Sequence, residues 1–301
     1  MIIRPETAQD ISAIALVHTR AFEYRTVESL LVMLHRQRAQ FDPELSLVAE
    51  LDGQIVGHAL FSPQTLRLLG EDVATVNLAP LAVDPAHQRS GIGTALMEEG
   101  HRVARSKGIT LSFLLGHPTY YPRFGYQTHA YGSSSLVVNV DDLSGETLQS
   151  RPPVEGDVPA LHDLWRQEEA NVDFAIDPGP SFLDWISPNP AVTASVYRRD
   201  GEIVGYTRGA GCHVVSFLAR DHDAARGMVL SIAEGHSPIT LPLHPASASA
   251  GAFAMPPTVQ SWEAGMALSL ESDALALYYD TIQRGERAPG RPVWPVAFDI
   301  E

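Results

Sequence analysis

Cysteine and lysine are scarce in this 301-residue chain, which contains one of each, Cys212 and Lys107. A single cysteine can form neither an internal disulfide nor a cysteine-based metal cluster, so we expect no metal site of that kind. The chain also lacks an apolar run long enough for a membrane span, and its first five residues do not resemble a signal peptide. Together these absences favour a globular protein of the cytoplasm.

Positively charged residues are also few: the chain has 21 Lys and Arg residues and 36 Asp and Glu residues, which gives a net charge of −15. The average field repels polyanions such as nucleic acid and attracts small cations. With 45% hydrophobic residues, the chain can bury sizeable cores, and its length allows two domains of ordinary size. We therefore expect a small-molecule partner and neither a nucleic acid nor a membrane; the oligomeric state, monomer or homodimer, stays open.

Two short patterns recur along the chain. An Arg-Pro pair followed by an aspartate occurs at residues 4–10 and again at 151–157, an offset of 147. The sequence Asp-Gly-Gln-Ile-Val-Gly at 52–57 recurs at 200–205 with one change, an offset of 148. Two matches in the same order at nearly the same offset indicate an internal duplication. We predict two tandem copies, residues 1–148 and 149–301, divided near the polar segment 141–146.

The first copy has the pattern of an antiparallel meander with helices. Thr7 and Asp10 form a candidate capping box before a helical run of apolar residues, and Asp52-Gly53 is typical of a tight hairpin turn. A second hairpin is expected near residues 70–72. This order of elements favours the α+β class over alternating βαβ units. The expected elements are strands at 2–3, 45–51, 55–61 and 73–83, and a helix at 11–22.

A glycine-containing loop connects the strand ending at residue 83 to a helix that begins near Gly91. Free backbone N–H groups and the dipole at a helix start bind phosphate oxygens, and glycine at 91 and 93 would let the backbone approach them. Arg89 adds a positive charge. A plain connecting loop is one alternative. A nicotinamide-binding loop is another, but it needs a small residue where Leu96 stands.

The segment Gln88-Arg89-Ser90-Gly91-Ile92-Gly93 resembles the Q/R-x-x-G-x-G/A motif of GNAT acyltransferases. The resemblance implies a mixed, mostly antiparallel, splayed sheet flanked by helices, with acetyl-CoA as co-substrate. It also implies that one strand lines the pantetheine arm and that the loop and helix start bind the pyrophosphate. The implied cofactor-binding residues are Leu81, Ala82 and Val83 on the strand and Gln88, Arg89, Ser90, Gly91, Ile92, Gly93 and Thr94 at the loop.

A second segment, residues 116–126, is similar to the L-G-D-P-x-Y-Y-x-R-F-G-F stretch of one GNAT subgroup, with His117 in place of Asp and Tyr126 in place of the last Phe. This resemblance implies that Tyr121 is catalytic and protonates the departing thiolate. A phenol of pKa near 10 gives its proton to a thiolate near 8.5 at a cost of about 2 kcal/mol. A lowered phenol pKa would therefore help. Phe124 and Tyr126 are expected in the core.

The general base is not identified by the sequence. Many GNAT enzymes place a glutamate on the strand before the cofactor loop, whereas residues 77–81 of this chain begin with Asn77 and contain no carboxylate. A water chain or an acid elsewhere could remove the proton, His117 could assist, and Glu23 and Glu28 could attract a cationic acceptor. We favour acetyl transfer to a primary amine of a small cationic molecule. A non-catalytic acyl-CoA-binding or sensing module is the alternative.

The second copy is expected to have lost its cofactor site. Residues 217–229, at the place of the cofactor loop, contain one glycine, Gly227, and the carboxylates of Asp221 and Asp223 would repel a diphosphate. The aromatic segment is replaced by residues 246–251, which composition predicts to be a flexible loop. We expect one CoA per chain, with the second copy forming part of the acceptor cleft.

Overall fold

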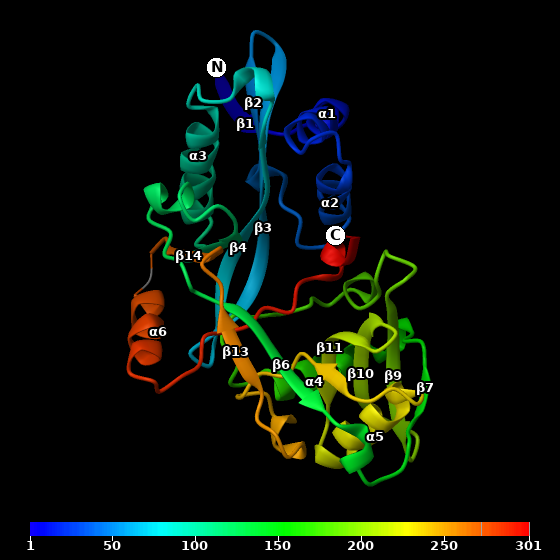
Figure 1. The fold of residues 1–301 in the computed structure, drawn as a ribbon. Helices are drawn as coiled ribbons and strands as arrows, with labels where there is room; N and C mark the ends of the chain where they lie inside the picture. The colour runs from blue at the N-terminus through cyan, green and yellow to red at the C-terminus, as the bar shows by residue number, and fades with distance from the viewer. Residues whose placement is uncertain (272, 301) are drawn as a thin grey trace.

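The computed structural model describes residues 1–271 and 273–300. Two seven-stranded sheets, each flanked by helices, form the molecule; the first lies in the upper part of Figure 1 and the second at the lower right. The mixed α and β class and the mostly antiparallel sheets are as predicted. No helix in the described part of the chain is long and apolar enough to cross a membrane.

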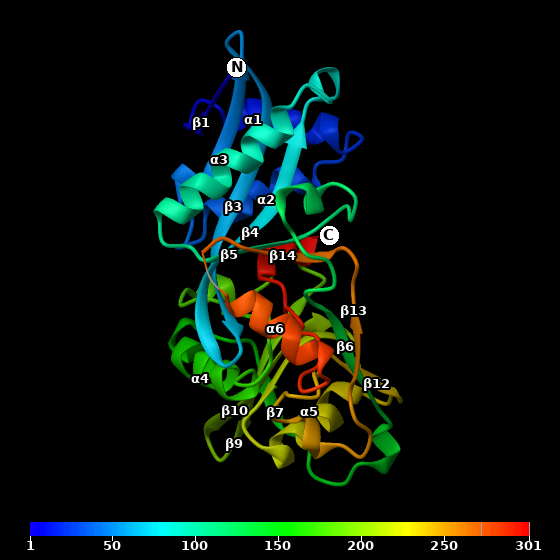
Figure 2. The ribbon, with the colours of Figure 1, turned by 90° about the vertical axis from the view of Figure 1, so that its left-hand side faces the viewer.

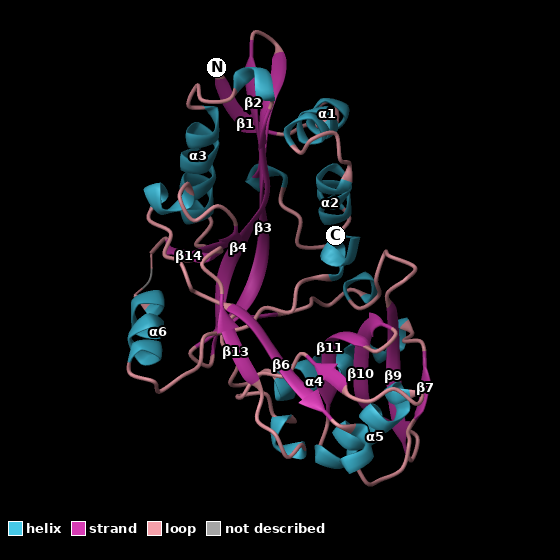
Figure 3. Ribbon diagram, in the orientation of Figure 1, coloured by secondary structure: helices cyan, strands magenta, loops and turns pink. Residues whose placement is uncertain are grey.

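The first sheet has helices on both faces, with α1 and α2 on one side and α3 on the other (Figures 1 and 3). Its core lies between the strands and α3, where Leu96 and Met97 are fully buried. Gly100 lets α3 approach closely, because a Cβ there would lie 2.0 Å from the ring of Phe61. The elements are β1 (Ile2–Pro5), α1 (Ile11–Ala21), α2 (Val27–Arg36), β2 (Ser46–Leu51), β3 (Gln54–Leu68), β4 (Glu71–Val83), α3 (Ile92–Ser106) and β5 (Leu111–Leu115).

The second sheet follows the same plan with shorter strands. It is flanked by α4 (Val158–Glu168) and α5 (His222–Ala233), which lie with it at the lower right of Figure 1. In sheet order its strands are β13 (Thr258–Ser261), β6 (Gly132–Val138), β12 (Ile239–Leu241), β11 (His213–Ala219), β10 (Glu202–Ala210), β9 (Thr193–Arg199) and β7 (Gln149–Arg151). A short strand, β8 (Ala175–Ile176), pairs with β3 of the first sheet instead.

The repeated sequence patterns form the same local structures in both halves. The Asp10 carboxylate accepts hydrogen bonds from both Nη atoms of Arg4, at 2.7 and 3.0 Å, and from a backbone N–H three residues before it. Asp157 does the same with Arg151, at 2.6 and 2.8 Å. The turns at 52–53 and 200–201 both have two residues with positive φ. The two tandem copies predicted from the sequence are therefore visible in the fold.

Local expectations are met closely, with two differences. The helix and hairpins lie where they were predicted, although β3 runs seven residues past residue 61. The predicted capping box is incomplete: Asp10 accepts from the backbone N–H of Thr7, but the Thr7 hydroxyl bonds to Asp10 rather than to the helix. The helix begins at Ile11 with Asp10 at its N-cap, so Thr7 lies too early in the chain to cap the first turn.

The two sheets exchange strands across residue 148. Strand β14 (Gly265–Ser269), which precedes α6 (Ala274–Gln283), pairs antiparallel with β5 and so belongs to the first sheet (Figure 2). Conversely, β6 pairs antiparallel with β12 in the second sheet. The predicted division into residues 1–148 and 149–301 therefore separates the two sequence copies but does not separate the two sheets.

Candidate active site

Strands β4 and β5 diverge in the middle of the first sheet. They pair in parallel only from Thr75↔Leu111 to Asn77↔Phe113. Beyond that point β4 continues to Val83 beside β3 alone, while the end of β5 pairs with β14. A gap therefore opens between two neighbouring strands, which is the splay predicted for this sheet.

The backbone of β4 faces this gap at alternate residues. The N–H of Asp84 donates to the carbonyl of Val56 at 2.9 Å, so the antiparallel pattern directs the N–H and C=O of Leu81 and Val83 away from β3. The Val83 carbonyl accepts a hydrogen bond from Gln88 Nε2 at 3.2 Å. By the same pattern, the polar backbone groups of Ala82 face β3. Of the three predicted strand residues, Leu81 and Val83 are thus the two that can pair with a ligand in the gap.

The loop after β4 leaves the start of α3 uncapped. Arg89 and Gly91 have positive φ values of 61° and 86°, and the first α-helical bond runs from the Ala95 N–H to the Gly91 carbonyl. Among the residues that the structure describes, no side chain caps the N–H groups of residues 92–94, and a Cβ on Gly91 would meet nothing within 4 Å. Open space beside free N–H donors fits a diphosphate. Ser90 shapes the loop by donating to the His87 carbonyl.

The predicted loop residues differ in what they can offer a ligand. Arg89 is exposed, and no ion pair involves it among the described residues. The Ile92 side chain is 3% exposed and packs in the core, so only its N–H faces the loop. The structure brings Gln88, Ser90, Gly93 and Thr94 together around the same helix start.

Tyr120 lies across this helix start, which sequence reasoning missed. A Cβ on Gly93 would lie 2.7 Å from the Tyr120 hydroxyl, and that hydroxyl is hydrogen-bonded to the Thr94 side chain. The Arg123 guanidinium covers the Tyr120 ring at 5.1 Å. Tyr120 is the first residue of the Tyr-Tyr pair in the sequence, whereas the resemblance implied a role only for the second, Tyr121.

Tyr121 begins the 3-10 helix Tyr121–Phe124, and its ring packs against Gly116 and Tyr126. Burial and the neighbouring Tyr120 raise the pKa of Tyr121 to about 12, which is opposite to the direction that would help an acid. Transfer of its proton to a thiolate of ordinary pKa would then cost about 3.5 pKa units, or ~5 kcal/mol. A sulfur that is itself desolvated in the gap has a raised pKa, which reduces this difference.

The other candidate side chains have structural or surface roles. Tyr126 is buried and its hydroxyl bonds to Ser112 Oγ at 2.6 Å and to His101 Nε2 at 3.0 Å, and Phe124 packs against the core, as expected. His117 and Glu23 are exposed, and Glu28 pairs with Arg25 at 3.8 Å. Within residues 1–271 and 273–300, no group of three or more His, Cys, Asp or Glu could hold a metal.

A cavity of about 820 Å³ lies beside the divergence. Asn77 and Ala79 of β4 and Leu115 of β5 form its wall on the first sheet. The opposite wall comes from the second sheet and from residues 291–299 near the end of the chain. Phe298 contacts the His35 ring at 5.4 Å, which holds this last segment against α2, where Figure 1 marks the C-terminus. The second copy thus encloses the space in front of the gap.

The second copy has no counterpart of the glycine loop. The Arg220 N–H donates to the Val204 carbonyl as Asp84 does to Val56, but only residue 221 separates Arg220 from the start of α5. In the first copy seven residues, 85–91, fill the same place. The Asp221 side chain accepts from the Ala224 N–H and caps the helix. Gly227, predicted at the loop, lies inside α5 instead, so that part of the prediction was wrong.

Comparisons with known proteins agree with this geometry. A family model described as an acetyltransferase (GNAT) domain matches residues 2–129. The Escherichia coli K12 proteins named uncharacterized N-acetyltransferases YjhQ and YhbS are 39% and 36% identical to this chain. The matches cover 39% and 44% of this chain, and 65% and 76% of those proteins. A GCN5-related N-acetyltransferase from Kribbella flavida, at 17% identity, shares the fold over 91% of this chain and 73% of its own (TM-score 0.72).

Proposed function

Because the chain belongs to the GNAT acetyltransferase family and has acetyl-CoA as its co-substrate, we propose that it transfers the acetyl group directly to a primary amine of a small, cationic molecule. The observation that carries the proposal is the arrangement along β4. The strand leads from the start of α3, past the backbone groups of Leu81 and Val83 that face away from β3, to a cavity beside Asn77.

Each part of this arrangement has a chemical task in the proposal. Acetyl-CoA supplies a thioester. In the reaction a C–N bond to the acceptor replaces the C–S bond of the thioester, the amine loses a proton and the sulfur gains one. The N–H groups of residues 92–94 and Arg89 hold the diphosphate, and the backbone of Leu81 and Val83 binds the arm. An N–H in the gap polarises the thioester carbonyl, and Tyr121 donates the proton to sulfur.

The alternative, an acyl-CoA-binding module without catalysis, has two observations in its favour. The pKa of Tyr121 is raised, and residues 77–81 of β4 contain no carboxylate that could act as the general base. We propose that residues 1–148 provide the cofactor site in either case. Residues 149–301 would then be the degenerate copy that encloses the acceptor.

Titration calorimetry and thiol release separate the two functions. We expect one acetyl-CoA per chain, because the helix start in the second copy is capped by Asp221. We also expect at least one member of a panel of primary amines to accelerate CoA release. Binding without acceleration by any amine would favour the binding module, and two CoA molecules per chain would contradict the degenerate second copy.

Arg89→Ala should weaken acetyl-CoA binding about 3–10-fold at low salt, or by ~1 kcal/mol, because an exposed cation is removed from the diphosphate. The difference from wild type should shrink as salt is raised. Arg102→Ala is the matched control, since Arg102 lies farther along α3 and pairs with Glu99. Equal loss in both variants would show a general charge effect rather than a contact at the loop.

A further inference from the structure

Unpartnered polar atoms gather around the cavity beside the β4–β5 gap. Asn77 is 1% exposed, yet among the residues that the structure describes neither its Oδ1 nor its Nδ2 has a hydrogen-bond partner. Arg208 Nε and Asp299 Oδ2 are also buried and make no hydrogen bond to a described residue, and all three residues line this cavity. A buried polar atom without a hydrogen bond costs about 1–3 kcal/mol, so these atoms around one cavity call for a physical reason.

Arg208 and Asp299 are held in place without satisfying each other. Their Nε and Oδ2 atoms are 3.4 Å apart, in contact as an ion pair but not hydrogen-bonded. Arg208 Nη2 donates to the Trp294 carbonyl at 2.7 Å, and the Asp299 carbonyl accepts from Asn189 Nδ2 at 2.8 Å. Burial raises the pKa of Asp299, and the nearby Arg208 and a hydrogen bond with the Ser187 side chain oppose that rise. Both groups are thus held in place, while Arg208 Nε and Asp299 Oδ2 make no hydrogen bond among the described residues.

A second ion pair at the same cavity shows what a purely structural pair looks like. Arg291 Nη2 bonds to Glu169 Oε1 at 2.9 Å, and Arg291 Nε bonds to Ser134 Oγ at 3.2 Å. The Arg291–Glu169 pair is therefore bonded directly and needs no ligand. The Arg208–Asp299 pair differs because its facing atoms stay unbonded.

We propose that Asn77, Arg208 and Asp299 form the acceptor subsite, and that the acceptor is a small amine with a hydroxyl or carboxylate oxygen next to its amino group. Asp299 Oδ2 accepts a hydrogen bond from the ammonium, and Arg208 Nε donates to the oxygen. Asn77, at the point where β4 and β5 diverge, binds the amine through Oδ1 and directs it toward the gap. This inference rests on the proposed function, whose acceptor it specifies.

The subsite predicts discrimination against amines that carry no oxygen. Such an amine would satisfy Asp299 but leave Arg208 Nε and Asn77 Nδ2 unpaired in the complex. Sites built to hydrogen-bond a substrate oxygen reject analogues without it strongly, because the buried partner then stays unsatisfied. Trp262, Trp294 and Phe298 also line the cavity and add apolar surface to it.

The first test measures kcat/KM at saturating acetyl-CoA for ethanolamine, serine and glucosamine, and for ethylamine and 1,4-diaminobutane. We expect at least one of the three oxygen-bearing amines to exceed both oxygen-free amines by 10-fold or more. Serine against ethanolamine then separates a carboxylate from a hydroxyl partner. An oxygen-free amine as the best acceptor would overturn the proposal.

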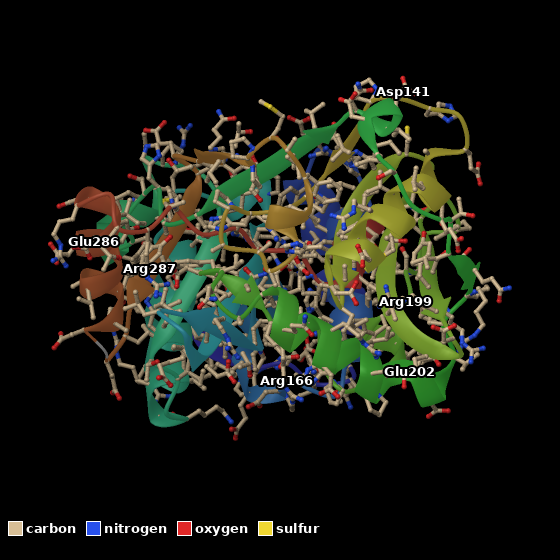
Figure 4. The ribbon with its side chains drawn as sticks, turned by 90° about the horizontal axis from the view of Figure 1, so that it is seen from below. Asp141, Arg166, Arg199, Glu202, Glu286 and Arg287 are labelled. Carbon is tan, nitrogen blue, oxygen red and sulfur yellow. The ribbon has the colours of Figure 1, made fainter. Side chains whose placement is uncertain are left out.

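The second test uses Asp299→Asn, Arg208→Gln and Asn77→Leu in the full chain. Each should raise the KM for the best amine at least 10-fold and leave the KM for acetyl-CoA within twofold. Asn77→Leu should also keep or raise Tm, because it removes an unsatisfied buried amide, whereas a structural role would lower Tm. Asp163→Asn is the control, because Asp163 is exposed and pairs with Arg166 of α4, which Figure 4 labels.

Calorimetry with the same amines distinguishes failure of the subsite from failure of the proposed function. Amine binding that weakens 10-fold in Asp299→Asn, without CoA release by any amine, would support the subsite and contradict catalysis. Acetylation with an amine KM that is unchanged in all three variants would support catalysis and overturn the subsite. Neither binding nor acetylation of any of the five amines would overturn both.

Discussion

Gly91→Val is expected to raise the Kd for acetyl-CoA about 100-fold or more, the largest effect of any single substitution in the loop. Gly91 has a φ of 86°, which only glycine adopts without strain, and its side-chain position opens into free space beside the start of α3. A valine there would fill the space that the diphosphate needs and would pull the N–H groups of residues 92–94 out of line. Titration calorimetry measures the loss directly.

Gly53→Val separates backbone strain from the blocked site. Gly53 has a similar φ of 77°, and its side-chain position also meets nothing within 4 Å, but it lies in the turn between β2 and β3. Both variants should lower Tm by similar amounts, and only Gly91→Val should lose affinity for acetyl-CoA. A folded Gly91→Val protein with wild-type affinity would refute the assignment of the loop.

Tyr121→Phe is expected to reduce kcat about 10²-fold or more and to leave the Kd for acetyl-CoA within about twofold, since the ring stays and the proton is lost. The raised pKa of Tyr121, about 12, adds a pH prediction. The phenol must be protonated to act, so it should cause no alkaline decline in kcat below about pH 11. Rapid assay of CoA release across pH checks both statements.

Tyr126→Phe is the control for the loss of a hydroxyl in the same aromatic cluster. It leaves Ser112 and His101 without their buried partner, so it should lower Tm while changing kcat by no more than a few-fold. If Tyr121→Phe keeps kcat within twofold of wild type, another group protonates the sulfur. Tyr120, whose hydroxyl lies at the start of α3, would then be the next residue to replace.

Sequence reasoning succeeded where the signal is local. The Asp52-Gly53 turn and the glycine loop both depend on residues close together in the chain. It failed to predict the strand exchange, because the residues of β5 look the same whichever strand lies beside them. Strand β14, which pairs with β5, begins at Gly265, about 150 residues later, and neither segment contains a pattern that predicts this pairing.

Composition also misjudged the segment 246–251, which was expected to be a flexible loop. Its backbone and hydroxyl are held by one buried carboxylate: Ser249 N and Oγ donate to Glu168 Oε1 at 3.1 and 2.6 Å. A third bond joins the Ala248 N–H to the Glu168 carbonyl. The small residues of this segment predict flexibility. Glu168, which holds the segment in place, lies some 80 positions earlier, and the sequence alone does not connect the two.

The candidate site shows the same division between local and distant information. The loop and Tyr121 could be predicted because their motifs are contiguous. Arg208 and Asp299 were not predicted, because they reach the cavity from β10 and from residues 296–300. No spacing rule connects either of them to Asn77.

The exchange of β6 and β14 determines the order in which the two sheets can be completed during translation. When β5 leaves the exit tunnel, its outer edge has no partner, and it stays open until residues 265–269 have been made. An unpaired strand edge invites pairing with other chains. Meanwhile β6 can already join the second sheet as β12 emerges. The sheet that begins synthesis first is therefore the one completed last, and the edge of β5 stays open while residues 116–264 are made.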